Sequence, residues 1–130
     1  MENIRVPVSP GEVLDKITIL EIKSERMSDP EKVANVRLEL ALLRDTWSHA
    51  VAEDDVVREL HTQLKEINEA LWEIEDDIRD KERAREFDQR FIELARNVYF
   101  TNDRRSEVKK KLNLHLGSQI IEEKSYQDYA

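Results

Sequence analysis

The sequence predicts an all-α protein, an antiparallel bundle of about four helices, two short and then two long, with short extended termini. From Val57 to Ile78 an apolar residue recurs every three or four positions, which keeps one stripe of a helix against a partner helix. Neither Gly nor Pro interrupts the chain between Glu31 and Gly117. Charged residues make up 38% of the chain, beside two glycines and three prolines, a composition typical of helical proteins.

Composition narrows the classes of function. The 130 residues are expected to form one domain spanning 1–130. A net charge of −8 argues against a nucleic-acid partner, and the lack of cysteine excludes disulfides, thiolate chemistry and cysteine-based zinc sites. No apolar run approaches the ~20 residues of a membrane span, and the N-terminus does not resemble a secretion signal. We therefore expect a cytoplasmic protein without a membrane partner.

The first helix is expected over residues 10–27, after an extended segment at 3–8. Ser9 can act as N-cap, Pro10 suits the first helical position, and Glu12 completes a capping box. Apolar residues occupy two faces of this helix. One face carries Val13, Ile17 and Leu20, and the other carries Ile19 and Ile22. Such a helix is either central in the bundle or part of a subunit interface.

The second helix is expected over residues 30–48, capped by Ser28 or Asp29 and opened by Pro30. Its main apolar stripe is Val33, Val36, Leu40, Leu43 and Trp47. Leu38 and Leu42 fall on a second face.

Two longer helices follow, over about 54–84 and 88–116, and Gly117 is placed to end the last one. Each is roughly 45 Å long, against near 30 Å for the first two. Two short helices cannot cover the whole apolar stripe of two long ones, so the leftover surface favours a homodimer. The tail, 118–130, is expected to dock, and a place beside the extended N-terminal segment is one option.

A polar layer is predicted partway along the two long helices. The apolar face of the fourth helix is expected to contain Phe91, Ala95, Val98, Leu112 and Leu116, and the same face carries Asn102, Arg105 and Lys109. Folded back on the third helix, Asn102 and Arg105 come level with 66–71. Polar groups inside a bundle must be paired or hydrated.

The layer has two interpretations. It is a register-setting network, or a bend that exposes the helix to water; or it is a small-anion site with Arg105 as a bidentate donor and Asn102 as orienter. The candidate ligand-binding residues are Lys16, Asn68, Trp72, Tyr99, Asn102 and Arg105.

Metal and cofactor sites are not expected. Glu73-x-x-Asp76 resembles a fragment of the metal-binding motif of all-helical nucleotide pyrophosphohydrolases, but the acidic residues here share one helix, which favours a solvated face. The three histidines do not form a ligand-spaced pair. The basic run Arg104–Lys111 is expected to complement the acidic third helix or an acidic partner.

Several stretches of the chain resemble a bacterial family of small proteins of unknown function. They are Pro7–Glu12, Asp15–Lys23, Asn68–Asp76, Leu94–Arg96, Tyr99, Asn102–Arg105, Leu116–Ser118 and Glu122–Tyr126. The resemblance spans nearly the whole chain and implies a complete stand-alone domain. It brings no established activity, ligand or catalytic residue.

These observations favour a non-enzymatic interaction or assembly module that self-associates as a homodimer through its helical apolar stripes. The alternative, from a different class, is a small-molecule binding protein or enzyme that uses the layer around Asn102 and Arg105 for an anionic ligand.

Overall fold

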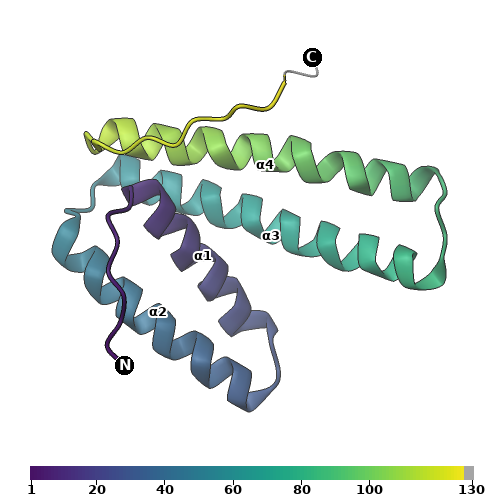
Figure 1. Cartoon of the computed structure of the whole chain (residues 1–130), viewed down its shortest axis with the longest axis horizontal. Coiled ribbons are helices and arrows are strands. Elements are labelled where there is room, and N and C mark those ends of the chain that lie inside the picture. The colour runs from purple at the N-terminus through teal and green to yellow at the C-terminus, as the bar shows by residue number, and fades with distance from the viewer. Residues whose placement is uncertain (128–130) are drawn as a thin grey trace.

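The computed structural model describes residues 1–127 and contains four α-helices (Figure 1). They are α1 (Pro10–Arg26), α2 (Pro30–Ala50), α3 (Asp55–Ala84) and α4 (Gln89–His115). The predicted all-α class is confirmed, and each helix boundary lies within two residues of its predicted position. Residues 118–127 of the predicted tail are not helical, and its last three residues lie outside the described part of the chain.

Local chemistry explains where the helices begin and end. Each begins after a residue whose side chain accepts a hydrogen bond from a backbone N–H of the first turn: Ser9, Asp29, Asp54 and Asp88. Arg85 follows α3 and Gly117 follows α4, both in the left-handed conformation, with φ of 55° and 67°. Asp29, one of the two predicted caps of the second helix, is therefore the one used.

The helices form two hairpins that diverge (Figure 1). α3 and α4 lie side by side, and α1 packs against α2, α3 and α4. Among the described helices, α2 packs against α1 alone. α1 is thus the central helix, one of the two positions predicted for it.

The core lies where α1 crosses the α3–α4 hairpin. Its members from α3 are Val57, Leu60, Leu64 and Ile67, which come from the first half of the predicted stripe. Leu71, Ile74 and Ile78, in the second half, are only half-buried. In Figure 1 this second half extends beyond α1 and α2, so along it α3 has α4 alone as a neighbour among the described helices.

The predicted apolar face of the fourth helix is wrong in its phase. The deeply buried residues are Leu94, Thr101, Val108, Leu112 and Asn113, and of the predicted apolar set Leu112 alone is among them. Phe91, Ala95, Val98 and Leu116 are half-buried. The error arises because α4 has two neighbours, α3 and α1, so its buried surface is wider than one stripe and includes polar residues.

The termini lie apart rather than together. The N-terminal segment borders a hollow of about 810 Å³ with Leu42, Leu43 and Thr46 of α2, whereas the tail runs back along α4 (Figure 1). The tail therefore docks, but not beside the N-terminal segment.

Candidate functional site

The centre of the polar layer is Asp15, a carboxylate of α1 that is only 2% exposed. It occupies one stripe of α1 with Gly11, Thr18 and Ile22, at spacings of four, three and four residues. The Nε of Arg105 donates to Oδ1 of Asp15 over 2.8 Å, and Nη2 of Arg105 donates to Oδ2. This bidentate pair joins α1 to α4.

Asn68 and Thr18 complete the shell around the carboxylate. The Nδ2 of Asn68 donates to Oδ1 of Asp15 and to Oγ1 of Thr18, each over 2.9 Å, and Oγ1 of Thr18 donates to the carbonyl oxygen of Asp15. All three residues are buried. Among the described residues, no buried side-chain nitrogen or oxygen lacks a hydrogen-bond partner. The layer is thus a satisfied network across α1, α3 and α4.

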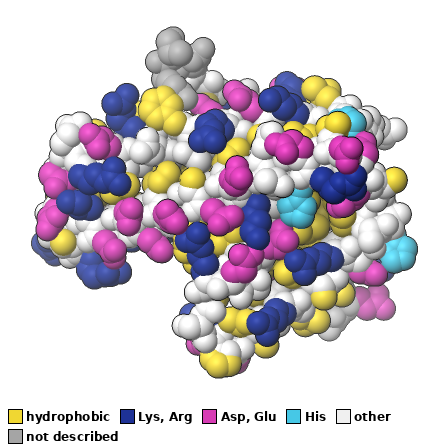
Figure 2. All heavy atoms as spheres, turned by 180° about the vertical axis from the view of Figure 1, so that it is seen from behind, with side chains coloured by type: hydrophobic (Ala, Val, Ile, Leu, Met, Phe, Trp, Pro, Cys, Tyr) yellow, Lys and Arg dark blue, Asp and Glu magenta, His cyan; other side chains and the backbone are white. Residues whose placement is uncertain are grey.

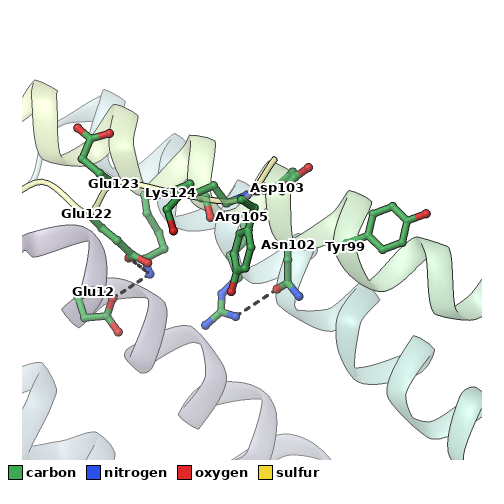
Figure 3. A pocket seen from close by; sticks show the side chains of 12 residues that line it. Glu12, Tyr99, Asn102, Asp103, Arg105, Glu122, Glu123 and Lys124 are labelled. Atoms are coloured by element: carbon green, nitrogen blue, oxygen red, sulfur yellow. Dashed lines mark hydrogen bonds and ion pairs between the residues drawn. The ribbon is translucent and has the colours of Figure 1, made fainter. Parts of the chain in front are cut away.

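Arg105 connects this network to the surface. Its side chain is 28% exposed, and its Nη1 donates to Oδ1 of Asn102 over 3.4 Å (Figure 3). The hydrogen bond to Asp15 raises the pKa of Arg105 above its ordinary value, so the guanidinium stays charged. The guanidinium group of Arg105 is therefore already paired with a carboxylate of the protein, that of Asp15.

One side of Arg105 borders a hollow of about 370 Å³ between the two hairpins, here called the inter-hairpin groove. Its wall contains Ile19, Ile22, Lys23, Asn68, Leu71, Trp72, Glu75, Asp76, Asn102 and Arg105. Apolar side chains form much of this wall, and the polar network forms one end.

The other side of Arg105 borders a second hollow, of about 580 Å³, here called the tail hollow, which lies between α4, the start of α1 and the tail (Figure 3). Lys109 spans it, with Nζ donating to Oε2 of Glu12 over 2.8 Å and to Oε2 of Glu122 over 3.0 Å. Burial lowers the pKa of Lys109, but the two carboxylates outweigh it and raise the pKa above its ordinary value. Residues from the stretches that carry the family resemblance meet around this hollow: Glu12, Tyr99, Asn102, Asp103, Arg105 and Glu122–Tyr126.

The structure brings together some, but not all, of the predicted ligand-binding residues. Asn68, Asn102 and Arg105 belong to the network, and Trp72 lines the inter-hairpin groove beside them. Tyr99 lines the tail hollow instead. Lys16 lies elsewhere, where its Nζ is 2.7 Å from Oε2 of Glu39 on α2.

Sequence reasoning missed Asp15, Thr18 and Asn113. The backbone N–H of Gly11 donates to Oδ1 of Asn113 over 2.7 Å, a second buried link between α1 and α4. A signal for the α1 residues was present, because Gly11, Asp15 and Thr18 share a stripe with Ile22. Because Ile19 and Ile22 are apolar, the predicted second face of this helix was centred on them. The buried stripe is instead the one that joins Ile22 to Gly11, Asp15 and Thr18.

A separate charged cluster surrounds Glu21 of α1. Oε1 of Glu21 lies 2.9 Å from Nε2 of His61 on α3, and Oε2 accepts a hydrogen bond over 3.1 Å from Arg44 on α2. Burial raises the pKa of Glu21, but His61, Arg44 and Lys65 together bring it below its ordinary value. This cluster is therefore a junction of three helices.

Neither a metal site nor a basic nucleic-acid surface stands out. Within residues 1–127, no three His, Asp or Glu side chains are grouped so that they could hold a metal ion. Acidic and basic side chains are interspersed on the face in Figure 2, including the end of the α3–α4 hairpin at its left. No helix in the described part of the chain is long and apolar enough to cross a membrane.

Comparison with known proteins places the chain in a family. No curated protein and no solved structure matches it. A family model does match, and it covers residues 4–129, which include all four helices, the polar network and the tail. The chain therefore belongs to the family of unknown function DUF6165.

Proposed function

We propose that this protein is a non-enzymatic assembly module that forms a homodimer through the projecting part of its α3–α4 hairpin. The observation that carries the proposal is the apolar surface that continues along this hairpin after α1 has ended. We call the part from Leu71 in α3 to Val98 in α4 the projecting hairpin.

The end of α1 marks where the covering helix stops. Arg26 is the last residue of α1, and its Nη2 lies 3.5 Å from Oε2 of Glu69 and 3.4 Å from Oε1 of Glu73. From this level onward the side of the α3–α4 hairpin that α1 covers nearer the core carries half-buried apolar side chains. These are Leu71, Trp72 and Ile78 of α3 and Phe91, Ala95 and Val98 of α4. The α4 residues lead at helical spacing to Asn102, which lines the inter-hairpin groove beside Leu71 and Trp72.

Charge favours a second copy of the chain as the occupant. Residues 69–77 contain five acidic and no basic residues, whereas residues 79–90 at the tip contain five basic and four acidic ones, a net charge of +1. An antiparallel pair of projecting hairpins, each about 20 Å long, would place each tip beside the acidic segment of its partner. Such a contact is self-complementary, as a two-fold interface requires.

The polar network supports a structural rather than a catalytic role for Arg105. Its guanidinium holds a buried carboxylate that also accepts from Asn68. Buried polar networks of this kind fix the register of packed helices. A fixed register would keep the projecting hairpin rigid and ready to pair.

Sedimentation velocity across a range of concentrations, with a substitution in the projecting hairpin, tests the proposal. Ala95 is half-buried on the proposed interface, and Asn97 is exposed on another face of α4. We expect Ala95→Arg to weaken dimerisation by at least about tenfold, because an unpaired guanidinium would have to be buried, and Asn97→Arg to leave it unchanged. A wild-type chain that stays monomeric, or equal dimerisation of the two variants, would rule the proposal out.

Ligand binding in the inter-hairpin groove is a second candidate. Its volume of about 370 Å³ suits a small molecule, and Asn102 and Arg105 stand at one end of its apolar wall. Arg105 has five N–H groups, and its bonds to Asp15 and Asn102 use three of them.

Thermal denaturation in phosphate and in citrate separates the two candidates. A carboxylate or phosphate bound in the groove would raise the melting temperature of the wild type but not of Asn102→Ala. Equal behaviour of both chains, together with dimerisation in the absence of these anions, would leave the assembly function standing alone.

A further inference from the structure

We propose that the face of α4 beneath the tail is a binding site for an extended acidic peptide of another protein, and that the chain's own tail takes the peptide's place. This inference concerns the tail hollow and does not depend on dimerisation. Three observations carry it: the order of charges on the tail and α4, the weak hold on the tail, and the space left beneath it.

The charges of the tail match those of α4 in order. Glu122 contacts Lys109 over 3.0 Å, and Glu123 contacts Lys110 over 3.8 Å. Farther along, Lys124 pairs with Asp103. The tail runs antiparallel to α4, so two acidic residues and then a lysine meet two lysines and then an aspartate. The basic run, predicted from sequence to complement the acidic third helix or an acidic partner, instead meets carboxylates of α1 and of the tail.

The tail is held in a way that permits exchange. Residues 118–127 are without helix or strand, and the side chains of Glu122 and Glu123 are 61% and 75% exposed. An exposed ion pair such as Glu123–Lys110 contributes about 0–1 kcal/mol, and Glu122–Lys109, whose lysine is 11% exposed, is the more sheltered of the two. The tail therefore remains in place largely because it is tethered, which gives it a high effective concentration.

The site beneath the tail is preformed. Lys109, 11% exposed with the tail in place, also pairs with Glu12, and Arg105 pairs with Asp15, so each cation has a carboxylate partner outside the tail. The tail leaves a hollow of about 580 Å³ against Tyr99, Asn102 and Ser106. A peptide with the same charge order and a bulkier side chain at this point would fill space that the tail leaves open.

Fluorescence anisotropy with a labelled peptide of residues 118–130 tests the inference in the full chain. In the wild type the attached tail should compete, so binding should be weak. Glu122→Lys with Glu123→Lys should release the tail and strengthen peptide binding by at least about tenfold, with an affinity that falls as salt rises. A peptide with the order Glu-Lys-Glu in place of Glu-Glu-Lys should bind more weakly.

A charge exchange controls for general electrostatic attraction. Lys109→Glu with Lys110→Glu in the chain that keeps its natural tail should repel that tail and abolish binding of the natural peptide, and a peptide with Lys at positions 122 and 123 should bind this chain instead. Equal binding of the natural peptide to the wild-type and tail-released chains would overturn the inference. So would absence of binding to the tail-released chain at low salt, or failure of the exchanged peptide to bind.

Discussion

At the scale of single residues, Asp15 determines how three helices meet. A carboxylate with almost no exposure must have partners, and it accepts two hydrogen bonds from one edge of the Arg105 guanidinium and one from Asn68. Arg105 suits this position because its planar guanidinium matches both carboxylate oxygens while its outer edge reaches solvent. The pair thus fixes α1 against α4 in one register.

Removal of Arg105 should therefore be costly. We expect Arg105→Leu to lower the free energy of unfolding by about 3 kcal/mol, the lower end of the range for an orphaned buried charge, because the site borders solvent. Urea denaturation would measure the loss. Arg104→Leu, at an exposed neighbouring position, should change stability little.

A double substitution separates the pair from its packing. Because an apolar pair can replace a buried ion pair at little cost, Asp15→Leu with Arg105→Leu should recover most of the loss. Equal stabilities of Arg105→Leu and Arg104→Leu would contradict the role assigned to the network.

At the scale of elements, α1 and α4 approach so closely that one position must be glycine. A Cβ on Gly11 would lie 2.7 Å from the carbonyl oxygen of Lys109 and 2.8 Å from Oδ1 of Asn113. The first of these atoms belongs to the backbone of a helix and cannot move aside alone. The stripe Gly11, Asp15, Thr18 and Ile22 therefore combines a close approach at one end with a buried ion pair in its middle.

Gly11→Ala should lower the free energy of unfolding by about 1–3 kcal/mol, even though alanine has the better helix propensity. The clash with a fixed oxygen exceeds the gain of about 1 kcal/mol in propensity. Thermal denaturation would measure the difference. An unchanged or raised melting temperature would show that α1 and α4 are farther apart.

At the scale of the whole molecule, the α1–α2 hairpin is joined to the α3–α4 hairpin through α1. Because α2 packs against α1 alone among the described helices, the cluster around Glu21 is an important link between α2 and the α3–α4 hairpin. It connects Arg44 of α2 with His61 of α3 through one carboxylate. The pKa of this carboxylate lies below the ordinary value of 4.5.

Because the pKa of Glu21 is lower in the folded state than in the unfolded state, its ionised carboxylate stabilises the fold fully at pH values above the unfolded pKa. This stabilisation is lost as the pH falls through the folded pKa. We expect Glu21→Gln to reduce the free energy of unfolding by about 1 kcal/mol at pH 7. The difference from the wild type should shrink as pH falls below about 4.5, the unfolded value. Urea denaturation at pH 7, 5 and 3 would follow it.

Glu25→Gln is the matched control, because Glu25 pairs with Lys65 on the same helix pair but is exposed. Its effect at pH 7 should be smaller. A Glu21→Gln effect that does not vary with pH would contradict an ionised carboxylate at the junction.

The sequence by itself determined the positions of the helices and the part of the polar network that α3 and α4 contribute. Capping residues and breaks determined the boundaries, and the first half of the unbroken apolar stripe of α3 identified its core residues. Asn68, Asn102 and Arg105 could be predicted as a polar layer because they interrupt or flank apolar stripes at the same level of a hairpin.

The tertiary structure decided which helices share the buried surface of α1 and α4. α4 lies against both α3 and α1, so its buried face is broader than one stripe and includes Thr101 and Asn113. The partner of Arg105 lies 90 residues away in the sequence, and its carboxylate could be recognised as buried only when α1 was placed across the hairpin. Helical periodicity records which side chains share a face, but it does not record which helix covers that face. The fit of one helix against another made Asp15, Thr18 and Gly11 part of the site.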